Sequence, residues 1–142
     1  MMEEDSKKMA EAGSFGLRLH FHARRPITGT EMGKVLGKAL IKSARPLTKS
    51  GFLLGHLKAV AKTNSGFVKV SVVDLTLGPE IDTDMPDKEI WDGVLNIMAA
   101  VVGHTDKEIG AAVESVVAAL SKNFGLEIER KEEGTTRFME LG

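Results

Sequence analysis

The 142-residue chain contains no cysteine, no tyrosine and a single tryptophan. Without cysteine it can form no disulfide, zinc ribbon, iron–sulfur cluster or reactive thiol, a composition that fits the cytoplasm. It has no run of about 18 apolar residues, so we expect no transmembrane helix and no membrane partner. The polar, acidic first ten residues predict no secretory signal.

The remaining composition is that of an ordinary globular protein. Hydrophobic residues make up 42% of the chain and charged residues 27%, which excludes a disordered or collagen-like chain. We therefore expect one α+β domain over residues 14–142, preceded by a disordered or frayed N-terminal segment, residues 1–13.

The formal net charge of −1 conceals an uneven distribution. Residues 1–72 contain thirteen Lys/Arg and five Asp/Glu, whereas residues 73–142 contain six and fifteen. A basic half can indicate an anionic partner. Alternatively, the two halves neutralise each other, either within one domain or between neighbouring subunits.

The first part of the chain alternates between strand and helix signals. Apolar and polar residues alternate from Phe15 to Ala23, which predicts a half-buried strand. Thr28 and Glu31 have capping-box spacing and predict a helix over residues 29–44. Two β-rich segments, 53–61 and 67–77, flank turn residues and predict a hairpin.

The second part predicts two helices and a terminal strand. Residues 89–102 follow Asp87, a suitable N-cap, and precede a glycine, so we expect a helix with Trp91 in the core. Residues 106–123 follow a second capping-box pair and predict another helix. Residues 126–131 predict the last strand, followed by a short hairpin return.

The predicted element order is β-α-β-β-α-α-β. Because each helix and each strand has one apolar face, we expect a ferredoxin-like two-layer sandwich with a C-terminal β-hairpin extension.

The polar sheet face is the most informative feature of this prediction. The first three strands all turn basic or histidine side chains away from the helices. Eight of them form the candidate ligand-binding surface: Arg18, His20, His22, Arg24, His56, Lys58, Lys62 and Lys69.

Histidines on this face also raise the hypothesis of a metal site. His20 and His22 are two residues apart on one strand and so share a face. With His56 they would give three imidazoles, as in open sites for a divalent transition metal. A strand lies between those of His20 and His56 in the expected order, however, which places them about 10 Å apart.

Glycines recur every four residues in the predicted helix 29–44, at Gly29, Gly33 and Gly37. Such a smooth stripe is typical of close helix packing. The alternative is anion capture at the helix N-terminus, assisted by Thr28, Thr30 and Lys34.

Our leading interpretation is a non-enzymatic binding domain that uses the basic sheet face for a small anionic ligand or nucleic acid, as a homo-oligomer. Phe67 is the one outward aromatic available for base stacking, which disfavours RNA. The alternatives are a metal- or histidine-dependent enzyme acting on a small anionic substrate, and an assembly protein whose basic and acidic halves pair between subunits.

Overall fold

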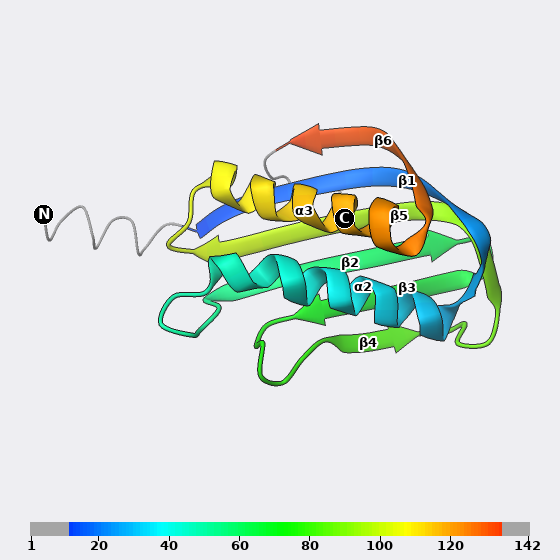
Figure 1. Cartoon of the computed structure of the whole chain (residues 1–142), viewed down its shortest axis with the longest axis horizontal. Helices are drawn as coiled ribbons and strands as arrows, with labels where there is room; N and C mark the ends of the chain where they lie inside the picture. The colour runs from blue at the N-terminus through cyan, green and yellow to red at the C-terminus, as the bar shows by residue number, and fades with distance from the viewer. Residues whose placement is uncertain (1–11, 135–142) are drawn as a thin grey trace, which may run out of the picture.

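The structure, a computed structural model, describes residues 12–134 as one six-stranded antiparallel sheet and two α-helices (Figure 1). The strand order is β4-β3-β2-β5-β1-β6. The elements are β1 (Ala12–Thr28), α2 (Gly29–Ala44), the 3-10 helix η1 (Arg45–Leu47), β2 (Gly55–Thr63), β3 (Gly66–Val72), β4 (Glu80–Thr83), β5 (Glu89–Val102), α3 (Asp106–Phe124) and β6 (Leu126–Gly134). Strand β1 therefore includes the last two residues of the segment 1–13 that was expected to be frayed.

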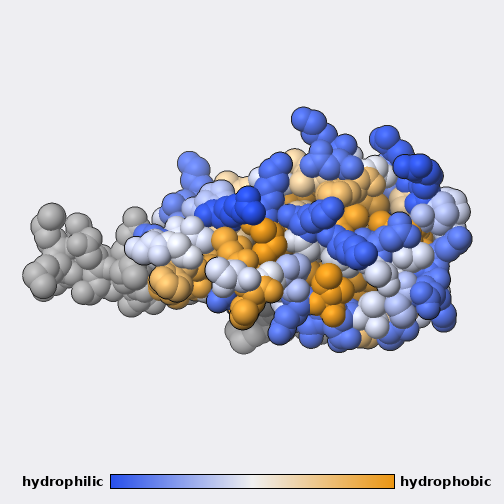
Figure 2. Space-filling view, turned by 60° about the horizontal axis from the view of Figure 1, so that its bottom comes forward, coloured by the Kyte–Doolittle hydropathy of each residue, from blue (hydrophilic) through white to orange (hydrophobic). Residues whose placement is uncertain are grey.

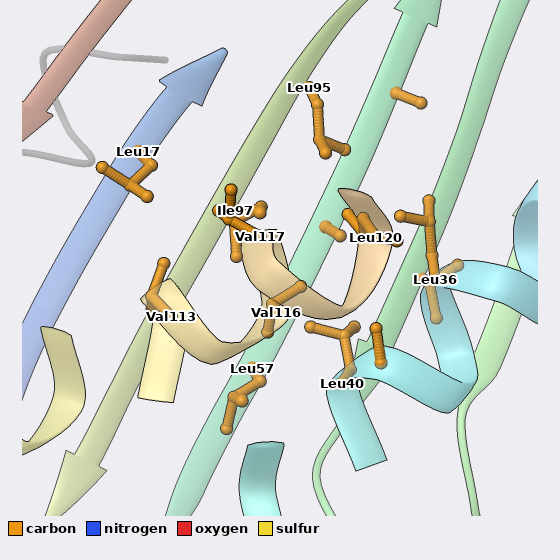
Figure 3. Packing of buried hydrophobic residues seen from close by; sticks show 14 of the residues in the cluster. Leu17, Leu36, Leu40, Leu57, Leu95, Ile97, Val113, Val116, Val117 and Leu120 are labelled. Carbon is orange, nitrogen blue, oxygen red and sulfur yellow. The ribbon is translucent and has the colours of Figure 1, made fainter. Parts of the chain in front are cut away.

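Both helices lie on the same face of the sheet (Figure 1). The strand side chains that point toward them are almost fully buried; Leu17, Leu19 and Phe21 of β1 are at most 3% exposed. Figure 3 shows how leucines of the sheet meet Val116 and Leu120 of α3 and Leu36 and Leu40 of α2. The opposite side, which we call the open face, is covered by neither helix.

The two helices begin where the sequence predicts. Thr28 and Thr105 are the N-caps, and each forms a complete capping box with the glutamate three residues later. Helix α3 ends at Gly125, whose φ of 66° provides the left-handed C-cap. Neither helix of residues 12–134 is long and apolar enough to cross a membrane.

The predicted fold class is wrong. The order β-α-β-β-α-α-β and the ferredoxin-like two-layer sandwich required a helix over residues 89–102, and that segment is strand β5. It pairs with both β1 and β2 at the centre of the sheet.

The misreading of β5 has a physical cause. Its inward residues Leu95, Ile97, Ala99 and Val101 are buried, and its outward residues are also mostly apolar. With apolar residues on both faces, the period-two signal of a strand disappears. Trp91, expected in the core, is 47% exposed near the start of this strand.

The structure also bears on two further predictions, for the segment after β3 and for the end of the chain. The acidic segment after β3, expected to be a loop, contains edge strand β4, which pairs with β3 from Val68 to Ser71. Strand β6 is a single strand through Gly134, and the predicted hairpin return after it lies outside the described residues.

The glycine stripe of α2 serves packing. A Cβ on Gly29 would overlap the carbonyl oxygen of Met85, and one on Gly33 would lie 2.5 Å from Ile81 Cγ2. The helix N-terminus is also occupied by protein groups, because Thr30 donates its N–H and its hydroxyl to the carbonyl of Pro86 at 3.1 Å each. Since the N–H groups of Thr30 and Glu31 already donate to protein oxygens, they are not free for the alternative of anion capture.

A histidine fastens the start of α3 to the segment after α2. The His104 side chain is 8% exposed, and its Nε2 lies 2.8 Å from the carbonyl oxygen of Leu47. Its Nδ1 lies 3.3 Å from Glu108 Oε2. The backbone N–H of Thr105, followed by the His104 hydrogen bond, lowers the pKa of Glu108 to about 2.

The substitution Gly29→Ala should lower the free energy of unfolding by about 2 kcal/mol, because the added methyl group overpacks the contact with the Met85 backbone. Chemical denaturation measures this. The control is Lys34→Ala, at an exposed position of the same helix, which should change stability by less than about 0.5 kcal/mol. Equal stability of the Gly29→Ala variant and the native protein would contradict the tight contact.

Acid should destabilise the native protein partly through Glu108. Its folded-state pKa lies below the ordinary value of 4.5, so its contribution is present above pH 4.5 and is lost as the pH falls toward 2. Glu108→Gln should therefore unfold with a flatter pH dependence in this range, as measured by thermal melts. Glu31→Gln is the matched control, because Glu31 occupies the same capping-box position in α2. Parallel curves for native protein and Glu108→Gln would refute the assignment.

Candidate functional site

All eight predicted ligand-binding residues lie on the open face. They alternate with buried neighbours along β1, β2 and β3, and each is exposed except Lys58, which is half-buried. The structure does not, however, gather them into one site. The strand register divides them into a lysine–arginine group, a histidine group and an isolated histidine, although His20 and Lys62 line one hollow of about 420 Å³ together with Asp92.

The lysines surround one residue of β2. Lys58 and Lys62 lie two residues before and after Val60, and Lys69 of β3 is directly opposite it. On the other side, Val60 pairs with Asn96 of β5.

Arg18 completes this arrangement from β1, where it pairs with Asn96. We call Arg18, Lys58, Lys62 and Lys69 the cationic ring. At about 4.8 Å between strands and 3.4 Å per residue, opposite members of the ring are about 14 Å apart at their backbones. None of these four side chains is in either of the ion pairs found among the described side chains, those of residues 13–129.

The two histidines of β1, His20 and His22, lie in a more acidic part of the open face, which we call the acidic corner. His22 pairs with Asp92 of β5 on one side and with Glu127 of β6 on the other. His20 pairs with Glu129, and a shallow hollow of about 380 Å³ lies among these side chains. A histidine next to a carboxylate can act as a general base when a substrate reaches it.

Arg24, also predicted in the basic site, belongs to this corner too. Its Nε lies 3.4 Å from Glu127 Oε1, and both side chains are more than half exposed. An ion pair this exposed is worth less than about 1 kcal/mol, so it holds Arg24 only weakly in this corner.

His56 is separated from the other two histidines. It pairs with Ala100 of β5, whereas His20 pairs with Val94, six residues away along the same strand. That separation is about 20 Å, in addition to two strand spacings. The proposed trio of His20, His22 and His56 therefore does not form within this chain, and no three His, Asp or Glu residues of the described part are grouped to hold a metal ion.

The strand order also explains the uneven charge of the sequence. Acidic β4 pairs with basic β3, placing Asp82 opposite Lys69, and acidic β6 pairs with β1. The basic and acidic halves of the chain thus lie side by side in one sheet. The acids of the sheet are concentrated on its two edge strands, while most of the lysines and arginines of the sheet lie on inner strands.

The sequence did not reveal the apolar strip that crosses the open face. Val94, Met98 and Ala100 of β5 and Val60 of β2 are half-buried there. Because the sequence predicts a helix at β5, it does not place Val94, Met98 and Ala100 on the open face. No period-two signal separates them from the buried residues of β5, because both faces of that strand are apolar.

Comparisons of this chain with protein-family models, with curated proteins and with solved structures found no match.

Proposed function

We propose that the open face binds a compact, multiply charged anion at the cationic ring. The observation that carries this proposal is the placement of Lys58, Lys62 and Lys69 on three sides of Val60, with Arg18 beyond Asn96 on the fourth. Long basic side chains on this perimeter can bend toward a common centre. Phosphate groups are suitable ligands, because lysine and arginine both bind them through charge-assisted hydrogen bonds.

The lysines of β2 have no acidic residue opposite them. Two other members of the ring do, because Lys69 pairs with Asp82 of β4 and Arg18 pairs with Glu132 of β6. Lys58 and Lys62 pair only with uncharged residues on both sides. Cations held together without counter-charges repel one another and gain from a bound anion.

The surroundings of the ring favour a small ligand over a nucleic acid. Base-reading sheets use several aromatic platforms, and here Phe67, opposite Lys62, is the one aromatic residue beside the ring. The centre instead offers an amide at Asn96 and an aliphatic surface at Val60. A phosphorylated metabolite with a modest apolar part fits this chemistry.

The test is calorimetric titration of the full chain with inorganic tripolyphosphate at low and moderate salt. Lys58→Gln/Lys62→Gln should weaken binding about tenfold, because each exposed charge pair contributes up to about 1 kcal/mol. The matched control is Lys107→Gln/Lys122→Gln on α3, which removes two exposed lysines from the helix side of the molecule. Its affinity should equal that of the native protein.

An equal loss in both variants, or no binding to the native protein, would refute the proposal. A parallel titration with oligothymidylate tests nucleic acid. If the ring holds a single strand, the logarithm of the binding constant should fall linearly with the logarithm of the salt concentration. The slope should be about −0.7 for each phosphate contact. Binding to oligothymidylate alone would replace the small-ligand proposal.

The apolar strip supports a second candidate function, association of two copies through their open faces. Val60, Val94, Met98 and Ala100 are half-buried side chains at the centre of a sheet face, where a second sheet packs at about 10 Å. Sedimentation over a range of concentrations tests this. Met98→Lys should shift the protein to monomer if the strip is an interface, and an unchanged mass would exclude it.

A further inference from the structure

A groove on the other side of the molecule is independent of the open face. It lies between α2 and the β4 edge and has a volume of about 510 Å³. Its floor is formed by Gly37, Ile41, Pro79 and Ile81. A Cβ at Gly37 would lie 2.9 Å from Pro79 Cγ, so a glycine is needed where the helix approaches this edge.

Four basic side chains border the groove. Lys34, Lys38 and Lys42 follow one another at four-residue intervals, about 6 Å apart along the helix, and Arg45 continues the row. All four are exposed, and neither ion pair found among the side chains of residues 13–129 includes them. Like charges four residues apart weaken a helix, so this row does not serve the stability of α2.

The helix provides little compensation of its own. Glu31 is the one acidic residue of α2, and its carboxylate is engaged in the capping box with Thr28. A counter-charge for the row must therefore come largely from outside the helix. The row and the apolar floor together form a surface that is cationic along one side and aliphatic along its base.

Two apolar side chains at or near this edge are exposed to solvent. Leu77, in the loop between β3 and β4, is 81% exposed, and Ile81 is 44% exposed. Figure 2, which brings this edge of the molecule forward, shows hydrophobic surface beside hydrophilic side chains. The eight residues that line the groove include no aromatic ring and no side-chain amide with which to recognise a base.

We propose that this groove binds a monomeric single-chain amphiphile, with its carboxylate or phosphate head on the row Lys34–Lys38–Lys42–Arg45 and its alkyl chain along Ile41, Pro79 and Ile81. The charge of the row selects an anionic head, and the aliphatic floor accommodates an alkyl chain. The volume is within the usual range of about 300–1,000 Å³ for small-molecule sites.

The test uses the full chain and dodecyl phosphate below its micelle-forming concentration, followed by calorimetry. Octyl phosphate should bind more weakly, by about threefold to fourfold for each methylene group that no longer contacts the floor. Inorganic phosphate and the uncharged dodecyl maltoside should each bind at least tenfold more weakly than dodecyl phosphate.

Lys38→Glu is the key variant, because it separates binding from folding. A glutamate at this position faces Lys34 and Lys42 at favourable helix spacing, so the variant should melt at the same temperature or higher. Its affinity for dodecyl phosphate should nevertheless fall about tenfold. The matched control, Lys107→Glu on α3, should leave the affinity unchanged.

Several outcomes would overturn the proposal. Undiminished binding by Lys38→Glu, or equal binding of dodecyl maltoside, would show that the groove does not select an anionic head. Binding to vesicles of equal parts phosphatidylcholine and phosphatidylglycerol, without binding to monomeric dodecyl phosphate, would assign the surface to a membrane. A dimer that dissociates in Lys38→Glu, measured by light scattering without amphiphile, would assign it to a second copy.

The open-face variant Lys58→Gln/Lys62→Gln distinguishes the groove from the cationic ring experimentally. It should bind dodecyl phosphate as the native protein does, while Lys38→Glu should retain the affinity for tripolyphosphate. Loss of dodecyl phosphate binding in the open-face variant would place the amphiphile on the sheet and overturn the groove.

Discussion

The packing of two helices against one face of a six-stranded sheet is the constraint on which the rest of the structure depends. Leu17 of β1, Leu57 of β2 and Leu95 of β5 are at most 1% exposed beneath α2 and α3 (Figure 3). Apolar burial of this kind is the main favourable contribution to folding. Since strand side chains alternate between faces, each residue buried here fixes its neighbours on the open face. The cationic ring is thus positioned by the core behind it.

The same argument applies to α2. Met32, Leu36 and Leu40 are buried at four-residue intervals. At about 100° per residue, positions two residues further along point to the opposite side of the helix, and Lys34, Lys38 and Lys42 occupy those positions. The repeat that attaches the helix to the sheet therefore aligns its cations in a second row. Because Gly33 and Gly37 have no side chain, the helix packs closely against Ile81 and Pro79, and the row lies beside this aliphatic floor.

The sequence predicts an element well where its polar and apolar faces differ. Strand β1 has alternating polar and apolar residues, and helices α2 and α3 each have one apolar face and a capping box. The sequence therefore predicts the positions of these three elements. Strand β5 does not, because Val94 and Met98 make its outward face apolar as well. Strand β4 is four residues long and mostly exposed, and it depends on contacts with α2 that lie more than forty residues away in the chain.

The sequence also predicts only part of the candidate site. Which face each basic residue occupies follows from period two, and the structure agrees for all eight. Which residues come together depends on register and strand order, and no local pattern contains either. That is why Lys58, Lys62 and Lys69 gather around Val60, whereas His56 lies opposite Ala100, far from His20.

The distribution of acids determines where an anion can bind. A chain with a formal net charge of −1 has no long-range attraction for anions, so any selectivity must come from local fields. Glu80 and Asp82 on β4 and Glu127 and Glu129 on β6 place negative charge along both sheet edges, where charged side chains also discourage pairing with other chains. What remains positive is the centre of the open face and the outer side of α2. Because the sheet and its core separate these two regions, each must recognise its ligand through its own surroundings: an amide and a valine in the ring, an aliphatic floor in the groove.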